Sequence, residues 1–569
     1  MNFYMNKYNE WINDSYFDEE TKYELKQIKD NNKEIEDRFY KDLEFGTGGL
    51  RGIIGYGTNR INKYTVRKAT FGLCNYILKK YGKQGKEKGV VIAYDSRYKS
   101  KEFCDETAKI LAICGIKSYI YDTPRSTPQL SFSVRYLNCV AGVVITASHN
   151  PPEYNGYKVY WSDGGQVCPD IANEIISEVN KIKDYKEIPN NDNINKSLIK
   201  VLDEEVDNAF IYAIKKQIIN QEIIDKVGDK IKIIYTPIHG TGNLPVRKVL
   251  SVAGFKNVEI VKEQEMPDSN FSTVKCPNPE DKEVFEIAID MAKKSNADLI
   301  IGTDPDCDRV GVVVKDTVGD YIALNGNQIG SLLANYVISS NREGILKMKK
   351  PTILKTIVTS ELGVDIASKN GVECVETLTG FKFIGQKINE FELNKDRTFV
   401  MAYEESYGYL IGTHVRDKDG VVSTLLICEM AAYYYDRGMT LYEGLQEIYE
   451  KYGYYKQYLK SITLKGIDGI NKIKKIMEYF RNFEIKKIAN INVNKIKDYK
   501  EGIDGLPKSD VLKFILEDNS WIAIRPSGTE PKIKFYFETN GKSQIEIDNK
   551  LKNIIEDIEL IYRNIYELV

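Results

Sequence analysis

The chain has 569 residues, of which 42% are hydrophobic and 28% charged, and its 80 Lys and Arg nearly cancel its 82 Asp and Glu. This length exceeds what one hydrophobic core supports, so several domains are expected, and the balanced charge gives no global attraction to nucleic acid or to a membrane. The nine cysteines are scattered without a CxxC pair, and neither an amino-terminal apolar segment nor an apolar run of membrane-spanning length occurs. These features favour a cytoplasmic protein.

The first forty residues are polar and helix-like, and they lead into a glycine-rich segment at 45–52. Beyond it the pattern alternates, with a predicted strand at 89–94 and a predicted helix at 101–114. Two further series of the same kind follow, and the last hundred residues mix lysine-rich helices with strands. This order predicts an α/β protein with three similar units and a C-terminal α+β unit.

The segment after the apolar run 140–145 carries the first candidate site. The run predicts a buried strand, so Ser148 and His149 fall at its carboxyl end, where open α/β sheets bind ligands. Asn155-Gly156 predicts a tight turn that returns Lys158 towards this loop. A lone serine after a strand is most often a cap or turn residue, so a nucleophilic Ser148 needs support from elsewhere.

Three aspartates on alternate residues give that support. Asp304, Asp306 and Asp308 follow the predicted strand 297–301. A solvated acidic turn is one alternative. An EF-hand loop is excluded, because its sixth position holds Arg309 in place of glycine and its twelfth a lysine in place of glutamate. Three carboxylates suit a hard cation such as Mg²⁺, and the absence of a Cys/His cluster argues against zinc.

Two later segments carry groups that suit a phosphorylated sugar. The segment 403–408 places Glu404 and Ser406 after a strand, although a charged surface loop would look the same. The segment 525–532 combines an arginine, two hydroxyls and a glycine, which together can hold a phosphate through guanidinium and backbone N–H donors.

The motifs TASHNP, DPDxDR, EESxG and RPSGTEP occur in this order, and together they resemble the α-D-phosphohexomutase superfamily of phosphoglucomutases and phosphomannomutases. The likeness runs from about Phe45 to Lys534. The N-terminal extension and the segments 236–242 and 377–382 look most like the branch of bacterial phosphoglucomutases and phosphopentomutase-type enzymes. Phe381-Lys382 stands where many phosphomannomutase-type members carry a histidine.

The resemblance implies four domains around a central cleft. Residues 1–208 would form domain I with the phosphoserine loop and the N-terminal helical extension, and residues 209–320 domain II with the metal loop. Residues 321–455 would form domain III with the sugar loop, and residues 456–569 domain IV with the phosphate loop.

The resemblance also implies roles for single residues. Ser148 would be the phosphoserine, and Mg²⁺ would be held by Ser148, Asp304, Asp306 and Asp308. The transferring group would be stabilised by Arg51, Lys158 and Arg309. Sugar hydroxyls would be bound by Glu404 and Ser406. The distal phosphate would be held by Arg525, Ser527, Gly528 and Thr529, with Lys382 nearby. The general acid/base stays open among His149, Lys158 and Lys382.

The expected activity is a Mg²⁺-dependent phosphosugar mutase that interconverts glucose 1-phosphate and glucose 6-phosphate, with glucose 1,6-bisphosphate as activator. Catalysis would depend mostly on positioning and charge, and we expect movement of domain IV to close the cleft. Phosphopentomutase and phosphomannomutase activities are the alternatives within the class. A non-catalytic phosphosugar-binding protein and a Mg²⁺-dependent phosphatase are the alternatives outside it. The sequence indicates neither a nucleic-acid nor a membrane partner, and it leaves monomer and homo-oligomer open.

Overall fold

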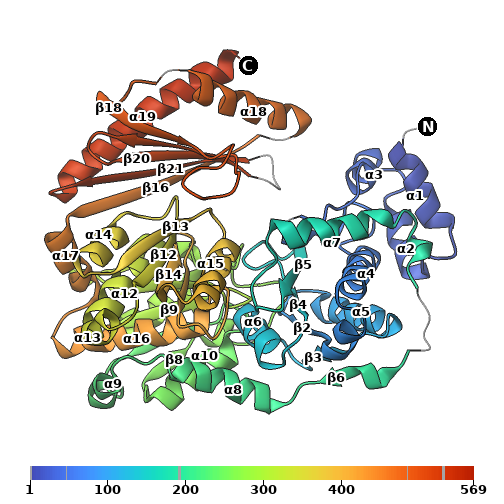
Figure 1. Cartoon of the computed structure of the whole chain (residues 1–569), viewed down its shortest axis with the longest axis horizontal. Helices are drawn as coiled ribbons and strands as arrows, with labels where there is room; N and C mark the ends of the chain where they lie inside the picture. The colour runs from blue at the N-terminus through green and yellow to red at the C-terminus, as the bar shows by residue number, and fades with distance from the viewer. Residues whose placement is uncertain are drawn as a thin grey trace.

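The computed structural model describes residues 3–46, 48–189, 194–464, 466–483, 485–527 and 532–568. Their strands form four sheets, and Figure 1 shows the fourth stacked on the third while the first lies to one side. We number the domains I to IV after these sheets. The expected fold class, three mixed α/β units followed by an α+β unit, is confirmed.

The sheet of domain I is mixed. Its strand order is β1 (Gly49–Ile53), β5 (Tyr154–Trp161), β4 (Ala141–Ile145), β2 (Val90–Tyr94), β3 (Ser118–Ile120) and β6 (Ile199–Val201). Strands β1 and β5 run antiparallel to their neighbours, and the others are parallel. The predicted strand at 140–145 and the predicted helix at 101–114 are therefore confirmed as β4 and α5 (Ser100–Ile113).

Helices cover both faces of this sheet because its central strands are apolar on both sides. Val90 and Ile92 pack with α4 (Lys63–Lys88), α5 and α7 (Pro169–Lys181). Val91 and Ala93 point the other way, towards α6 (Thr127–Tyr136) and α8 (Glu204–Lys215). This two-sided burial fixes the sheet edge at which the loops after β2 and β4 meet.

The N-terminal extension is helical, as predicted, and its helices are α1 (Phe3–Asn13), α2 (Glu19–Gln27) and α3 (Asn32–Phe39). An aromatic cluster that includes Trp11, Phe17 and Phe39 packs them against Tyr64 of α4. The extension is thus part of the outer layer of domain I (Figure 1).

The sheet of domain II has the order β11 (Tyr321–Leu324), β10 (Val310–Lys315), β9 (Leu299–Thr303), β7 (Ile233–Thr236) and β8 (Val258–Ile260). Helices α9 (Gln221–Val227), α10 (Asn243–Ala253) and α11 (Glu286–Ser295) accompany it. Strands β9 and β10 pair antiparallel, with Thr303 opposite Val310, so the residues between them form a tight loop. β11 extends this sheet to residue 324, four residues beyond the expected end of the domain at 320.

The sheet of domain III has the order β13 (Glu373–Thr377), β12 (Pro351–Thr356), β14 (Thr398–Glu404) and β15 (Gly408–Ile411). Its helices are α12 (Gly326–Ser340), α13 (Arg342–Leu346), α14 (Leu362–Lys369), α15 (Phe381–Asn394), α16 (Gly420–Asp436) and α17 (Leu441–Tyr452). Helix α16 is almost entirely buried and also packs on α9 and α10. Domains II and III therefore share one core.

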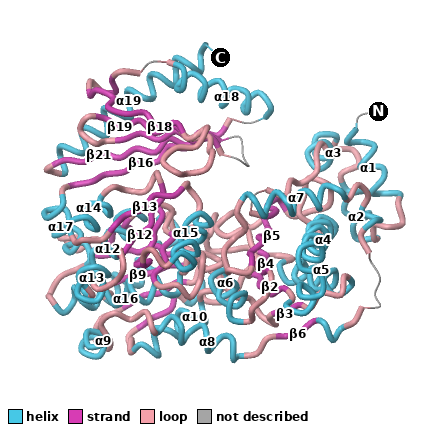
Figure 2. Tube along the Cα trace, in the orientation of Figure 1, coloured by secondary structure: helices cyan, strands magenta, loops and turns pink. Residues whose placement is uncertain are grey.

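Domain IV is antiparallel throughout. Its order is β16 (Tyr454–Thr463), β21 (Lys532–Gly541), β20 (Trp521–Pro526), β19 (Leu512–Leu516), β18 (Ile491–Asp498) and β17 (Lys487–Ile488). Helices α18 (Gly466–Asn482) and α19 (Gln544–Leu568) cover one face, and the other faces domain III (Figure 2).

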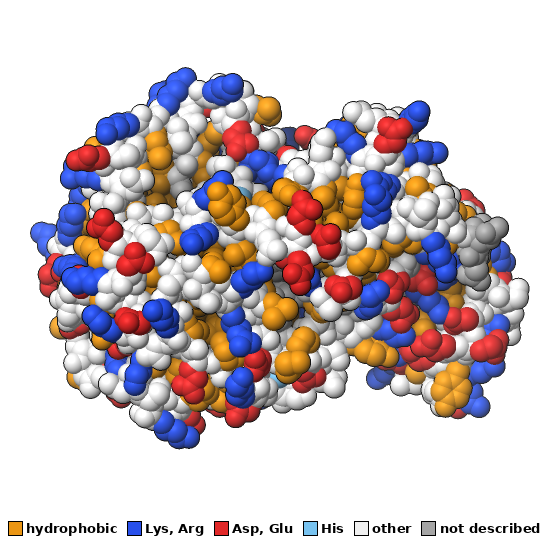
Figure 3. Space-filling model, turned by 90° about the horizontal axis from the view of Figure 1, so that it is seen from below, with side chains coloured by type: hydrophobic (Ala, Val, Ile, Leu, Met, Phe, Trp, Pro, Cys, Tyr) orange, Lys and Arg blue, Asp and Glu red, His pale blue; other side chains and the backbone are white. Residues whose placement is uncertain are grey.

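Acidic and basic side chains are both spread over the face in Figure 3, in keeping with the balanced composition. None of the helices in the described part of the chain combines the length and the apolar character that a membrane crossing requires.

Candidate active site

Ser148 lies at the carboxyl end of β4, where the sequence predicts it. Its backbone has the left-handed φ of 53°, which is rare for a residue other than glycine, and its side chain is buried. Its Oγ donates to Asp304 Oδ2 at 2.7 Å and lies 3.3 Å from His149 Nδ1. Its N–H donates to Thr146 Oγ1 at 2.8 Å. The strained backbone and these contacts orient the Ser148 hydroxyl towards the aspartates of domain II.

Arg97, which the sequence reasoning missed, supports the Ser148 loop. Its guanidinium donates to the backbone carbonyls of Ser148 at 2.5 Å, Pro151 at 2.8 Å and Tyr154 at 3.0 Å, and to that of Asn150. Its Nε lies 3.3 Å from a carboxylate oxygen of Asp95. The available signal was its place three residues after the strand 90–94, at the sheet edge that also carries Ser148.

The predicted tight turn at Asn155-Gly156 is wrong. Both residues lie inside β5, where Gly156 pairs with Arg51 of β1. A Cβ on Gly156 would lie 2.3 Å from the carbonyl oxygen of Thr146, so the glycine permits the close approach of neighbouring strands. Lys158 reaches the site because it projects from a strand of the same sheet.

The three aspartates form one buried cluster in the β9–β10 loop. Each offers an oxygen, and these oxygens lie within 4.8 Å of one another. The N–H groups of Asp308 and Arg309 both donate to Asp304 Oδ1 at 3.0 Å. Oδ1 of Asp306 and Oδ1 of Asp308 are buried without a hydrogen-bond partner. Buried carboxylate oxygens left without donors fit a cation ligand set, so the residues present suit a divalent metal.

Two lysines partly balance this negative charge. Lys158 Nζ lies 2.9 Å from Asp306 Oδ2, and Lys418 Nζ lies 3.0 Å from Asp308 Oδ2. Burial and repulsion from Asp306 raise the pKa of both Asp304 and Asp308. Burial acts in the same sense on Asp306, but Lys158 and hydrogen bonds to its carboxylate outweigh it and lower its pKa. The sequence reasoning missed Lys418. The available signal was its place in the charged segment that follows His414.

Three further predicted residues border the cluster. Arg51 Nη1 donates to Asn150 Oδ1 at 3.1 Å, and Arg309 pairs with Glu280. Burial, then the positive charges of Arg309 and Arg51, lower the pKa of His149. All three line the same cavity as Ser148. Positive charge therefore surrounds the place where a phosphate on Ser148 would sit.

Domain III contributes the loop after β14. Glu404 Oε1 accepts a hydrogen bond from the N–H of Gly380 at 2.9 Å. Burial, followed by repulsion from Glu405, raises the pKa of Glu404 to about 7. Glu404 and Ser406 line the cavity, whereas Lys382, at the second position of α15, is not among its lining residues.

Domain IV contributes cations from two paired strands. Arg525 on β20 lies opposite Lys534 on β21, and both line the cavity together with Lys532. Burial and then the charge of Arg525 both lower the pKa of Lys382, although Cys168 acts in the opposite sense. The N–H of Ser527 donates to the carbonyl of Lys532 at 2.7 Å. Gly528 and Thr529 lie outside the described residues.

The cavity has a volume of about 610 Å³, and each of the four domains supplies part of its wall. Among the described residues, its charged lining consists of Arg51, Lys158, Glu280, Asp308, Arg309, Glu404, Glu405, Lys418, Arg525, Lys532 and Lys534, and Ser148, His149 and Ser406 line it as well. The Ser148 hydroxyl and Asp308 of the aspartate cluster line one part of the wall, and a separate group of cations belongs to domain IV.

Comparison with known proteins finds family models that match each of the four domains. Four family models match in order, described as phosphoglucomutase/phosphomannomutase alpha/beta/alpha domain I at residues 42–186, domain II at 208–319, domain III at 325–452 and the C-terminal domain at 480–547. The phosphoglucomutase of Staphylococcus aureus (strain MSSA476) is 39% identical over 547 residues, covering 93% of this chain and 96% of the relative.

Two solved structures share the fold. Parafusin (phosphoglucomutase) from Paramecium, in its open form, matches with a TM-score of 0.68 and 20% identity over 93% of this chain and 96% of its own. The Aspergillus fumigatus N-acetylphosphoglucosamine mutase in complex with GlcNAc-6P and magnesium matches with a TM-score of 0.50 and 14% identity over 91% and 96%. With the sequence relatives and the motifs in place, the chain belongs to the phosphoglucomutase/phosphomannomutase family, the α-D-phosphohexomutase superfamily.

Proposed function

We propose that this protein is a phosphoglucomutase that interconverts glucose 1-phosphate and glucose 6-phosphate through a phosphoserine at Ser148 and a bisphosphorylated sugar. The observation that carries the proposal is the 2.7 Å contact between Ser148 Oγ and Asp304, at one side of a cleft whose other side bears cations of domain IV. The 39% identity to the S. aureus phosphoglucomutase over nearly the whole chain supports the choice of sugar.

Magnesium is the proposed metal, with Ser148 and the three aspartates as its ligands. The unpartnered Oδ1 atoms of Asp306 and Asp308 support this assignment, and magnesium accompanies the sugar phosphate in the Aspergillus mutase structure. When bound, a divalent cation would neutralise charge on the transferring phosphoryl group. Lys158, Arg51 and Arg309 would supply further positive charge there, and burial of the cluster would strengthen each interaction.

The sugar and the distal phosphate are assigned to domains III and IV. Glu404 and Ser406 would accept and donate hydrogen bonds to vicinal hydroxyls. The phosphate not being transferred would be held by Arg525, Ser527, Gly528 and Thr529, with Lys382 nearby. Because the intermediate bears two phosphates, it can turn over and present the other one to Ser148 while the cations of domain IV hold its partner. Glucose 1,6-bisphosphate would act as activator by keeping Ser148 phosphorylated.

His149, Lys158 and Lys382 remain the candidates for the general acid/base. His149 lies next to the nucleophile, Lys158 is engaged with Asp306, and Lys382 lies near the cations of domain IV. The nine cysteines are all free thiols in the described chain, which is compatible with the cytoplasmic location that is part of this proposal.

A turnover assay with Mg²⁺ and a trace of glucose 1,6-bisphosphate tests the proposal. Glucose 1-phosphate, mannose 1-phosphate and ribose 1-phosphate are compared, with Ser148→Ala as the control. We expect the highest kcat/KM on glucose 1-phosphate and its loss in the variant. A higher kcat/KM on ribose 1-phosphate or mannose 1-phosphate would change the proposed substrate and leave the proposed site residues unchanged. Hydrolysis without transfer, or no turnover of any of the three, would refute the mutase assignment.

A further inference from the structure

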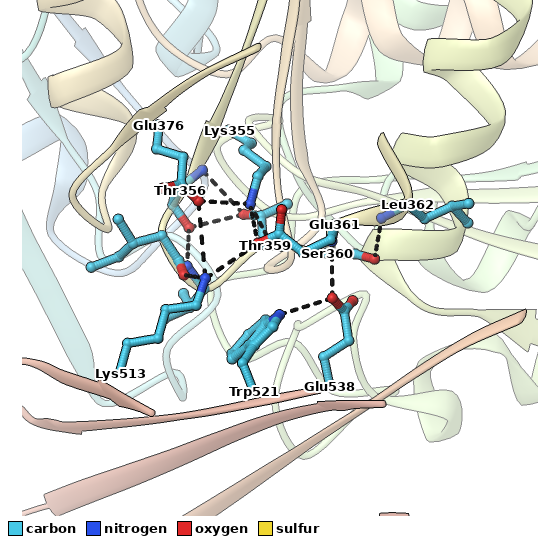
Figure 4. A network of polar contacts seen from close by, with 12 residues as sticks. Lys355, Thr356, Thr359, Ser360, Glu361, Leu362, Glu376, Lys513, Trp521 and Glu538 are labelled. Carbon is cyan, nitrogen blue, oxygen red and sulfur yellow. Dashed lines mark hydrogen bonds and ion pairs between the residues drawn. The ribbon is translucent and has the colours of Figure 1, made fainter. Parts of the chain in front are cut away.

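Residues 356–361, here named the bridging loop, join β12 to α14 and lie between domains III and IV (Figure 4). Ile357 and Val358 are buried in an apolar cluster whose other members include Trp521 and Tyr536 of domain IV. A loop of domain III therefore contributes to the core that joins the two domains, and its position depends on where the sheet of domain IV sits.

Polar contacts attach the same loop to domain IV at three points. Lys513 Nζ donates to the carbonyl of Ile357 at 2.8 Å and lies 3.2 Å from Glu361 Oε1. Glu538 Oε1 accepts the N–H of Glu361 at 3.0 Å, and the side chain of Gln457 donates to Ser360 Oγ at 3.1 Å. Lys513 and Glu538 are 3% and 1% exposed, so both are charged groups withdrawn from water by the contact between the domains.

Every charge in this cluster has a partner. Lys355 Nζ, fully buried, lies 3.0 Å from carboxylate oxygens of both Glu361 and Glu376 and donates to the carbonyl of Thr359 at 3.0 Å. The remaining carboxylate, Glu538, also accepts the indole N–H of Trp521 at 2.8 Å. A buried ionic cluster tolerates little displacement, because an unpaired member pays its full desolvation cost. The loop is thus held in one geometry as long as domain IV packs against domain III.

The opposite side of the bridging loop holds the sugar loop. Thr359 Oγ1 donates to Glu405 Oε2 at 3.0 Å, and Thr356 Oγ1 lies 3.3 Å from the same oxygen. Glu405 stands between Glu404 and Ser406, the residues proposed to bind sugar hydroxyls. It is therefore placed to fix the loop that carries them.

We infer that the bridging loop is a positioning element through which the position of domain IV against domain III determines the geometry of the sugar-binding loop 404–406. Glu405, Thr359 and Lys513 are its positioning residues. Domain IV then acts on the sugar twice, once through its phosphate-binding cations and once indirectly through domain III. The inference rests on the proposed function, because it assumes that loop 404–406 binds the sugar.

Two single variants and their combination test the inference. Lys513→Met removes the lysine's contacts with Ile357 and Glu361, one of the three polar attachments to domain IV. Thr359→Val removes the shorter of the two threonine contacts with Glu405 while keeping the shape of the side chain. We expect each to raise KM for glucose 1-phosphate about tenfold, the equivalent of one hydrogen bond to a charged group, with a smaller change in kcat. If both act along one path, the double variant stays near tenfold, whereas independent effects would multiply to about a hundredfold.

Tyr455→Phe is the matched control. It removes the 2.6 Å hydrogen bond from Tyr455 to Asp365, another contact between domains IV and III that leaves the bridging loop untouched. Its KM should stay within about twofold of the wild-type value, since the lost hydrogen bond does not involve the bridging loop or the loop 404–406. A tenfold rise in this control would show that any loosening of the interface suffices, and would overturn the specific role of the loop.

Amide hydrogen exchange of the substrate-free protein separates this inference from the proposed function. In Lys513→Met, peptides covering 356–361 and 403–408 should exchange faster than in the wild type and in Tyr455→Phe. Thr359→Val, which leaves the domain interface intact, should accelerate 403–408 and, within 356–361, the amide of Thr356, which donates to Thr359 Oγ1 at 3.3 Å. Unchanged exchange at 403–408 in both variants, or a hundredfold KM effect in the double variant, would refute the inference. Wild-type inactivity on glucose, mannose and ribose 1-phosphates would refute the proposed function while the exchange data still decide the coupling.

Discussion

Replacing Arg97 with methionine probes the support of the Ser148 loop most directly. The guanidinium donates to the carbonyls of Ser148, Pro151 and Tyr154 at 2.5, 2.8 and 3.0 Å and stands 3.3 Å from Asp95. Methionine fills much of the same volume and offers no donor. The change therefore removes the hydrogen bonds and the charge and leaves the packing nearly as it was.

The expected loss of stability follows from the groups that lose a partner when the guanidinium is removed. Asp95 is 1% exposed, and breaking a buried ion pair by removing one partner costs about 3–5 kcal/mol of unfolding free energy. The left-handed φ of 53° at Ser148 costs on the order of 1–3 kcal/mol and persists only while its surroundings enforce it. A displacement of Ser148, the proposed nucleophile, by about 1 Å would lower turnover by roughly a hundredfold. We expect Arg97→Met to show both losses.

Urea unfolding and single-substrate kinetics measure the two effects separately. Arg67→Met is the matched control, because Arg67 is also a buried arginine of domain I and pairs with Glu106 at 2.6 Å. It should lose stability while keeping kcat within a few-fold of the wild type at a temperature where both variants are folded. Equal kcat in the two variants would show that Arg97 stabilises the domain without positioning Ser148, and the reasoning would be wrong.

Three further predictions follow from single side chains. The pKa of Glu404 is raised from 4.5 to about 7, so its contribution to stability is complete below pH 4.5 and is lost as pH rises to about 7. Urea titrations of Glu404→Gln should lack this decline of about 3 kcal/mol, and an unaltered pH profile would contradict the burial argument. Mg²⁺ at 100 times its Kd should stabilise the wild type by about 2.7 kcal/mol and Asp306→Asn much less; an equal gain in both would place the metal elsewhere. Arg525→Ala should weaken substrate binding by about 1.5–3 kcal/mol, seen as a higher KM with kcat less affected, and an unchanged KM would remove Arg525 from the phosphate site.

The sequence was sufficient for the order of the elements and for the places of the main site residues. Apolar runs such as 140–145 and 299–301 predict buried strands, and a polar residue that closely follows such a strand must lie at the sheet edge. Ser148 and the three aspartates could be named in this way, because their positions depend on short-range order. The four domains and their arrangement around a cleft came from the motif resemblance.

The tertiary structure decided which distant residues meet. Asn155-Gly156 has the composition of a turn, yet pairing with β1 made it part of a strand, because sheet hydrogen bonds outweigh a two-residue preference. Arg97 and Lys418 look like ordinary charged loop residues in the sequence. Their roles arise only where burial removes water and leaves each charge dependent on the partners that the fold brings within about 3 Å.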